Sequence, residues 1–358
     1  MIRVEHKERR VEFDIMRIAA CFCVIMIHCA VFKQEESYAY DSWSYQAIHL
    51  WGTLSRWSVP AFVMLSGMLI LPHADETSVK RLILHRVLRM IAAYILWSAV
   101  YSFYNTYVLG IVYAPTKLKT FVDGCFSGEI HMWYLPMLAG MYLASPILAQ
   151  LMKKMDRKWL LYWVVCLFVF SSVIPFLIHL NIKYLSTIIG SFTGYMDLQF
   201  FGGWTLYYLL GCLVRDHRFS LKEKRWVYAL ALVSFLFTFY GTVIYSFRHK
   251  ETMGVLPYEY PNIMFFSLGV FLFVKDKMSG ISFGTGVKKW IVEISQLTFG
   301  IYLIHVLLLK IWYRAGVNLQ ICHPLLSIPL VSLIVFASAA AIVWLLRRIP
   351  YLRNSGLV

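Results

Sequence analysis

The chain has 358 residues, of which 59% are hydrophobic and only 15% are charged, and its mean hydropathy is +0.63. A composition this apolar excludes an ordinary soluble domain and indicates a polytopic membrane protein. The formal net charge of +15 does not call for a nucleic-acid partner, because the distribution of basic residues among the loops accounts for it.

Apolar windows of about twenty residues, enough for a helix to cross a hydrocarbon core of about 30 Å, predict ten membrane-spanning helices. We place them at residues 13–32, 48–71, 90–112, 132–151, 159–180, 197–214, 226–247, 261–274, 292–313 and 325–346. No connection between them is long enough to bury a core of its own. We therefore expect an all-α fold in which residues 1–358 form a single integral-membrane domain.

Basic residues are concentrated in alternate connections, which hold 24 of the 34 Lys and Arg residues. These connections are residues 1–12, 80–89, 153–158, 215–225, 275–289 and 347–358. Because cytoplasmic loops of membrane proteins are enriched in Lys and Arg, the alternation predicts that both termini are cytoplasmic. It also supports an even number of spans.

The first expected span carries three ionisable side chains, Asp14, Arg17 and His28. Charged groups in a spanning helix cost roughly 2.5–3.5 kcal/mol on insertion scales, so they usually face the protein interior or a wet cavity. Arg17 and His28 are eleven positions apart, which places both on one helical face, about 16 Å apart along the axis. Loop charge predicts that Arg17 lies toward the cytoplasm and His28 toward the outer face.

Each of these residues has a functional and a structural interpretation. An imidazole is the natural general base near neutral pH, so His28 could accept a proton from a hydroxyl; alternatively it forms a helix contact or lies at the interface. Arg17 could bind a phosphate or a carbonyl, or it could pair with Asp14, three residues away. Asp14 is as plausible a structural partner of Arg17 as a participant in chemistry.

Arg86 and Arg89 lie one helical turn apart in the basic segment KRLILHRVLR at residues 80–89. Together they could bind an anionic cytoplasmic donor through its phosphates. The alternative is an ordinary basic flank of the third span.

Two further histidines lie beside aromatic residues. His131 and Trp133 occur in HMWYL at the outer end of the fourth span, where a belt of interfacial aromatics is the simpler interpretation. Tyr302 and His305 share one face of the ninth span, where packing is the simpler interpretation. No metal site is expected, since the seven cysteines show no paired ligand spacing, and no G-x-S-x-G, H-E-x-x-H or phosphate-loop motif occurs.

Taken in order, five segments resemble membrane-bound acyltransferase family 3, whose members modify cell-surface glycans. The first is an Asp-x-x-Arg followed by ten residues and a His, here Asp14, Arg17 and His28, and the second is VPAFVMLSGMLIL, with Ser66 and Gly67. The others are HRVLRMIAAYILW, HMWYLPMLAGMYLASPIL and LTFGIYLIHVLLL. The subgroup that the chain most resembles is that of small enzymes similar to the enterobacterial common antigen O-acetyltransferase.

The resemblance implies an O-acyltransferase of the bacterial inner membrane. Such an enzyme would transfer an acyl group from cytoplasmic acyl-CoA to a hydroxyl of an envelope glycan or its lipid-linked precursor, and acetyl is the acyl group that we expect. Acyl-CoA would be a co-substrate, with no bound cofactor. The family's residues carry over to eight positions, namely Arg17, His28, Arg86, Arg89, His131, Trp133, Tyr302 and His305. One alternative is a transporter or flippase for a glycan or lipid-linked intermediate, a function that ten spans would also suit. Another is a membrane sensor without catalysis.

Overall fold

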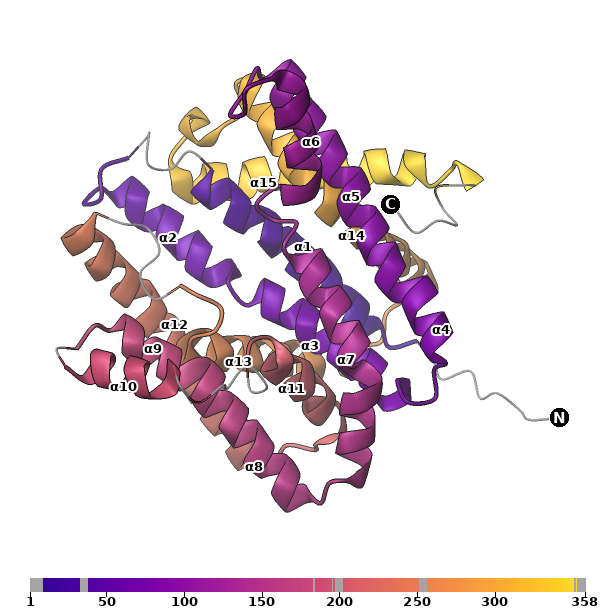
Figure 1. Cartoon of the computed structure of the whole chain (residues 1–358), viewed down its shortest axis with the longest axis vertical. Helices are drawn as coiled ribbons and strands as arrows, with labels where there is room; N and C mark the ends of the chain where they lie inside the picture. Colours follow the sequence, from indigo (N-terminus) through magenta and orange to yellow (C-terminus); the bar gives the residue numbers. More distant parts are fainter. Residues whose placement is uncertain are drawn as a thin grey trace.

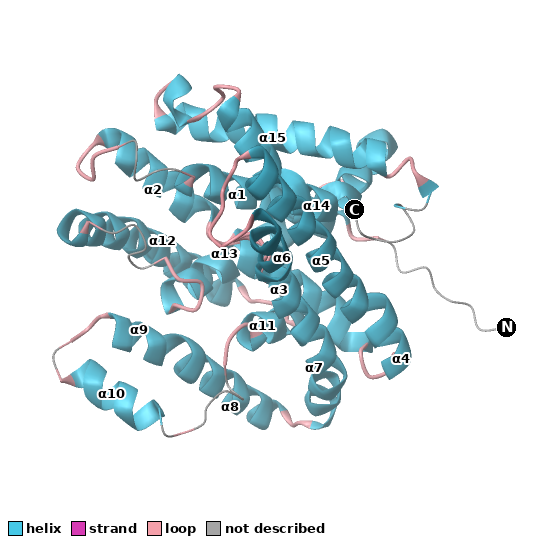
Figure 2. Ribbon diagram, turned by 45° about the horizontal axis from the view of Figure 1, so that its top comes forward, coloured by secondary structure: helices cyan, strands magenta, loops and turns pink. Residues whose placement is uncertain are grey.

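The computed structural model describes residues 9–32, 38–182, 184–194, 196, 202–250, 256–350 and 352. Within these ranges all regular structure is helical and no strand occurs (Figure 2), which confirms the expected all-α class. The helices are α1 (Val11–Val31), α2 (Trp43–Ser55), α3 (Ser58–Ile70), α4 (Val79–Leu82), α5 (Leu88–Phe103), α6 (Lys117–Ser127), α7 (Tyr134–Lys154), α8 (Arg157–Phe168), α9 (Ile174–His179), α10 (Leu185–Gly194), α11 (Thr205–Asp216), α12 (Leu221–His249), α13 (Pro261–Ser279), α14 (Thr285–Arg314) and α15 (Pro324–Leu346).

Eight helical segments in the described ranges are long and apolar enough to cross a membrane, which confirms a polytopic protein. Two of the ten expected spans correspond to less typical helices. α11 has 12 residues, about 18 Å, too short to cross the hydrocarbon core alone, and residues 197–201 of that expected span lie outside the described residues. α13 carries Lys275, Asp276 and Lys277 near its end. The count of ten therefore stays a prediction.

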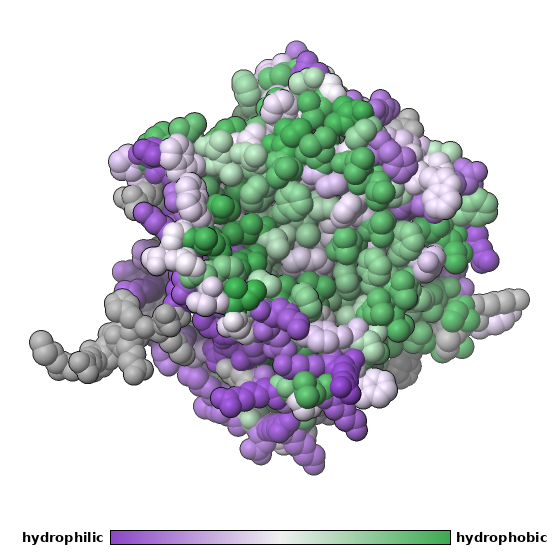
Figure 3. Space-filling view, turned by 180° about the vertical axis from the view of Figure 1, so that it is seen from behind, coloured by the Kyte–Doolittle hydropathy of each residue, from purple (hydrophilic) through white to green (hydrophobic). Residues whose placement is uncertain are grey.

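The outward-facing side chains of the bundle are largely apolar. Figure 3 shows a broad hydrophobic surface over the upper part of the molecule and a hydrophilic region at its lower left. Bulky apolar side chains such as Leu161, Val233 and Leu333 are more than half exposed. A surface of this kind is expected where lipid, rather than water, surrounds the protein.

α1 is the central helix of the bundle and packs against α2, α3, α13, α14 and α15 (Figure 1). Its 21 residues give a length of about 31 Å, which matches the hydrocarbon core. The helix is therefore surrounded mainly by protein, which explains how it can carry charged side chains.

α3 and α11 approach each other unusually closely, through a glycine on each helix. A Cβ atom on Gly67 would lie 1.9 Å from the Tyr208 carbonyl oxygen, and one on Gly211 would lie 1.9 Å from the Met64 carbonyl oxygen. Small residues at such crossings let two backbones come into contact within a membrane. This crossing positions Trp204, directly before α11, beside the site described below.

Polar contacts join the helix ends that carry the basic residues. The contacts are Ser295–Asp14 (2.7 Å), Arg347–Gln296 (3.4 Å), Lys224–Asp276 (2.6 Å) and Lys153–Asp75 (2.8 Å). They connect the starts of α1 and α12 and the third turn of α14 to neighbouring helices and helix ends. These are the ends that loop charge predicts to face the cytoplasm.

Candidate active site

One large cavity of about 940 Å³ opens between α1, α3, α7 and α14. Its lining also includes residues directly before α7, α11 and α13 and the residue after α2. The lining residues are Arg17, Val24, Ile27, His28, Val31, Phe32, Arg56, Val59, Phe62, Ser66, Glu129, Ile130, His131, Trp133, Tyr134, Leu138, Trp204, Pro257, Tyr258, Glu259, Thr298, Phe299, Tyr302, Val306, Leu309 and Lys310. A pocket of this size that mixes apolar walls with a few polar groups is typical of a small-molecule site.

Arg17 and His28 both line this cavity, as members of a single stripe along α1 that also includes Val24 and Val31. The spacing of the stripe follows the helical period, and α14 contributes a matching stripe of Thr298, Tyr302, Val306 and Lys310. The cavity therefore extends along much of the length of α1.

Three histidines from separate parts of the chain meet at the His28 end. His28 comes from α1, His131 from the turn before α7 and His305 from α14. The ring centroids lie 5.1 Å apart for His28 and His305, 4.9 Å for His131 and His305, and 5.9 Å for His28 and His131. His131 and His305 are only 2% and 0% exposed, whereas His28 is partly exposed to the cavity. His28 is therefore the accessible member of the cluster.

Hydrogen bonds to main-chain carbonyl oxygens hold the His305 ring and the backbone at His131. The Nδ1 atom of His305 lies 2.6 Å from the Tyr302 carbonyl oxygen. Because a carbonyl oxygen can only accept, Nδ1 is the donor in this hydrogen bond. The Tyr302 hydroxyl donates to the carbonyl oxygen of His131. Burial lowers the pKa of His131, which keeps this imidazole neutral. Tyr302 thus connects the two residues that pack against His28.

Asp14 lies outside the cavity lining and anchors Arg17. Its carboxylate is 1% exposed and accepts hydrogen bonds from Arg9 at 2.8 Å, from the Ser295 hydroxyl at 2.7 Å and from Arg17 at 3.2 Å. A buried carboxylate with three donors is well satisfied. Of its two interpretations, the contacts favour the structural partner of Arg17.

Arg86 lies just before α5, and Arg89 is in its first turn. Neither lines the large cavity, but both interact with the same tyrosine as Arg17. All three guanidinium groups interact electrostatically with the Tyr142 hydroxyl. The Arg89 guanidinium also lies 5.4 Å from the centroid of Phe299, which lines the cavity. The Nη1 atom of Arg86 is buried and lacks a hydrogen-bond partner among the described residues. An orphaned cationic donor of this kind is suited to an anionic ligand.

Ser66 also lines the cavity, one residue before the glycine of the α3–α11 crossing. Its hydroxyl interacts with those of Tyr134 and Tyr142. Through Tyr142, Ser66 is connected to Arg17, Arg86 and Arg89, which interact with the same hydroxyl.

Sequence reasoning did not single out four residues of the cavity. Arg56 and Lys310 lie inside the expected spans 48–71 and 292–313, so the rule that an intramembrane charge signals function applies to them as well. Lys310 pairs with Glu129 at 2.5 Å. Trp204 and Tyr258 have no signal of their own in the sequence, because aromatic residues are frequent along the whole chain.

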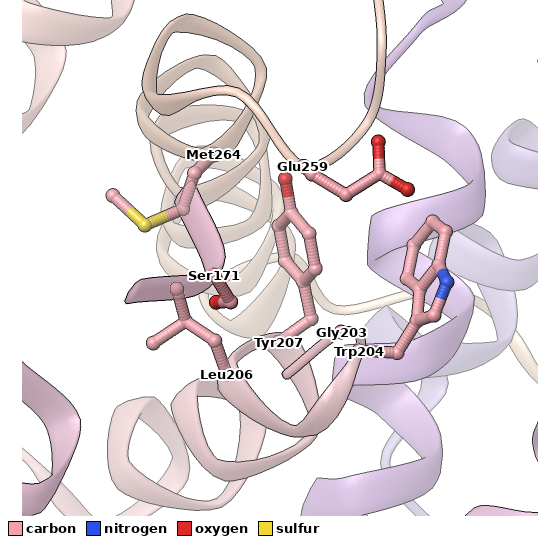
Figure 4. A pocket seen from close by; sticks show the side chains of 7 residues that line it. All are labelled: Ser171, Gly203, Trp204, Leu206, Tyr207, Glu259 and Met264. Atoms are coloured by element: carbon pink, nitrogen blue, oxygen red, sulfur yellow. The ribbon is translucent and has the colours of Figure 1, made fainter. Parts of the chain in front are cut away.

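A second, small cavity of about 10 Å³ lies beside the large one, and Trp204 and Glu259 line both. Figure 4 shows Trp204 and Glu259 on one side of the Tyr207 ring, with Ser171 and Met264 on the other. Its volume suits about one water molecule.

The described ranges contain no group of three or more His, Cys, Asp or Glu side chains that could hold a metal ion.

Two comparisons relate the chain to known proteins. The family model described as "Acyltransferase domain", acyltransferase family 3, matches residues 10–348. A relative from Bacillus subtilis (strain 168), described as "Putative membrane-bound acyltransferase YfiQ", is 21% identical over 349 residues, which cover 95% of this chain and 92% of the relative. No solved structure matches the chain.

Proposed function

Because the chain belongs to acyltransferase family 3, whose model covers residues 10–348, we propose that it is a membrane-bound O-acyltransferase with acyl-CoA as donor and an envelope glycan as acceptor. The acyl group proposed is acetyl, and the membrane is the bacterial inner membrane. The observation that supports this most strongly is the single cavity lined by Arg17 and His28. A donor in one compartment and an acceptor in the other require such a passage.

His28 is the proposed general base. Its imidazole takes the proton of the acceptor hydroxyl while the oxygen attacks the thioester carbonyl carbon. The carbon–sulfur bond then breaks, and the imidazolium returns the proton to the leaving CoA sulfur, so the products are the acetyl ester and free CoA. His131 and His305 pack against His28 and restrict the orientation of its ring, which keeps the base close to the reacting hydroxyl.

Arg86, Arg89 and Arg17 are the proposed donor site. The CoA phosphates would bind Arg86 and Arg89, where the buried Nη1 of Arg86 would gain a partner. The pantetheine arm would extend past Arg17 into the cavity and bring the thioester toward His28. Arginine suits this role, because its planar guanidinium can bind a phosphate through two hydrogen bonds.

The test is mass spectrometry of envelope polysaccharides from cells with the gene, without it, and with it restored. The proposal predicts that the deletion strain lacks about one acetyl mass per modified residue on a glycan that still reaches the surface. A transporter would instead leave unmodified glycan inside the cell. Unchanged glycan mass and location would contradict both functions.

A further inference from the structure

We propose that Trp133, Trp204 and Tyr258 form a binding platform for a pyranose ring of the acceptor, with Arg56 and Glu259 as its polar partners. This inference rests on the proposed function and adds to it where, and through which chemistry, the acceptor sugar binds. All five residues line the cavity that contains His28. A sugar on the platform would therefore share one space with the proposed base.

The three rings form a continuous aromatic surface. The Trp133 and Trp204 centroids lie 5.3 Å apart with an interplanar angle of 34°. Tyr258 lies 5.5 Å from Trp204 and 6.3 Å from Trp133. Trp133 is 39% exposed, and the other two rings are half-buried. All three line the cavity, so the aromatic cluster is partly accessible to a ligand there.

The platform is rigidly supported from behind. The Tyr207 hydroxyl donates to the Tyr258 carbonyl oxygen at 2.6 Å, and the Tyr207 ring lies 5.5 Å from Trp204. Tyr207 is only 4% exposed, and Figure 4 shows its ring beside Trp204 and Glu259. A preorganised surface of this kind loses little conformational entropy when a ligand binds.

Arg56 and Glu259 place hydrogen-bonding groups at the same wall. The Arg56 guanidinium lies 4.0 Å from the Tyr258 centroid, and its Nε atom donates to the Leu256 carbonyl oxygen at 2.7 Å. The terminal nitrogens remain as donors in the fork geometry that suits vicinal hydroxyls or a carboxylate. The exposed Glu259 carboxylate supplies acceptors.

This combination fits a sugar better than a lipid chain. A pyranose has an apolar face of C–H groups, which carry partial positive charge and stack on the electron-rich face of an aromatic ring, and a polar rim of hydroxyls. An acyl chain would offer no hydrogen-bond partner to the terminal nitrogens of Arg56 or to the Glu259 carboxylate. The platform residues also lie directly before α7, α11 and α13, at the helix ends remote from the basic loops, where an envelope glycan would approach.

The experiment measures binding of two oligosaccharide probes to the purified full-length protein in detergent, by tryptophan fluorescence and saturation-transfer NMR. The probes are chitotetraose, which is neutral, and tetragalacturonate, which carries carboxylates. We expect saturable binding of at least one probe, with the strongest NMR transfer to ring C–H protons. Trp133→Ala and Trp204→Ala should weaken this binding about ten-fold, and Trp133→Tyr, which keeps a ring, should weaken it less.

Trp226→Ala is the matched control, because Trp226 lies on the outer surface of α12 and is 63% exposed. It should leave binding unchanged. Arg56→Gln should weaken tetragalacturonate selectively if Arg56 binds a carboxylate, and both probes alike if it binds hydroxyls; either result supports the platform. Failure of both probes to bind, or binding that the Trp133 and Trp204 variants leave intact, would overturn it. Equilibrium dialysis of acetyl-CoA with the same preparations measures donor binding separately. Loss of sugar binding with intact acetyl-CoA binding would overturn the platform alone, whereas absence of acetyl-CoA binding would count against the proposed function.

Discussion

Neighbouring residues determine the role available to each ionisable side chain near α1. Asp14 and His28 are both intramembrane ionisable groups, yet Asp14 is 1% exposed and surrounded by donors, whereas His28 is accessible from the cavity. The first arrangement stabilises a structure, and the second leaves a group available for reaction. Spacing along the helix placed Arg17 and His28 on one face, but only tertiary structure could show that Arg9 and Ser295 also contact Asp14.

Replacing Asp14→Asn tests its proposed anchoring role. The variant removes the negative charge and leaves Arg9 and Arg17 without their shared partner, which should cost about 1–3 kcal/mol, given that both arginines are partly exposed. We expect the apparent melting temperature in detergent to fall by several degrees. Glu293→Gln, on α14 near Ser295, is the control and should melt like the parent chain. A melting temperature unchanged by Asp14→Asn would contradict the anchoring role.

The proposed phosphate contacts of Arg86 can be separated from general damage by changing the donor. Arg86→Lys loses bidentate geometry, so KM for acetyl-CoA should rise about ten-fold. Acetyl-pantetheine lacks the nucleotide phosphates, and its KM should be the same in the variant and the parent. Arg81→Ala, on the same basic segment, should leave both constants near those of the parent. Equal effects on both donors would show that Arg86 does not bind the phosphates.

At the scale of elements, the sequence predicts the long helices well and the irregular ones poorly. The first expected span, 13–32, agrees closely with α1, because a continuous apolar run with polar flanks defines both ends. The second, 48–71, is two helices, α2 and α3, which meet near Arg56. The junction contains Ser55, Arg56 and Ser58, but a hydropathy window of about twenty residues averages these polar positions with the apolar runs on both sides and so merges the two helices.

Gly67→Ala tests the close crossing of α3 and α11. An added Cβ would lie 1.9 Å from a backbone oxygen, so the helices must separate, at a cost of about 1–3 kcal/mol or more. We expect a lower melting temperature and weaker expression. Gly140→Ala, in α7, is the matched control, because no neighbouring atom lies within 4 Å of its added Cβ, and it should be neutral or slightly stabilising. Equal behaviour of the two variants would contradict the crossing.

At the scale of the whole molecule, one cavity connects features that lie far apart in the sequence. His28, His131 and His305 are separated by more than a hundred residues from one another, and each has an ordinary packing interpretation when taken alone. The resemblance to the family pointed to all three. Trp204, Tyr258 and Arg56 could not be found in this way, since they become a site only when α2, α11 and α13 pack together.

The predicted orientation can be tested with Cys322, which is exposed in the connection between α14 and α15. Loop charge predicts that this connection lies on the outer face of the membrane. A membrane-impermeant maleimide should therefore label Cys322 in intact spheroplasts of a Cys125→Ser background, and Cys322→Ser should abolish that labelling. Labelling that requires permeabilised membranes would reverse the orientation.

The most direct test of the account is acetyl transfer by His28 variants of the purified protein in proteoliposomes, with its glycan acceptor and acetyl-CoA. General base catalysis contributes about 10²–10⁴-fold, so His28→Ala and His28→Gln should reduce the turnover rate at least a hundred-fold. Acetyl-CoA affinity should not change, and His73→Ala, at an exposed residue beyond α3, should retain full activity. Full turnover in a folded His28→Ala protein would contradict the account.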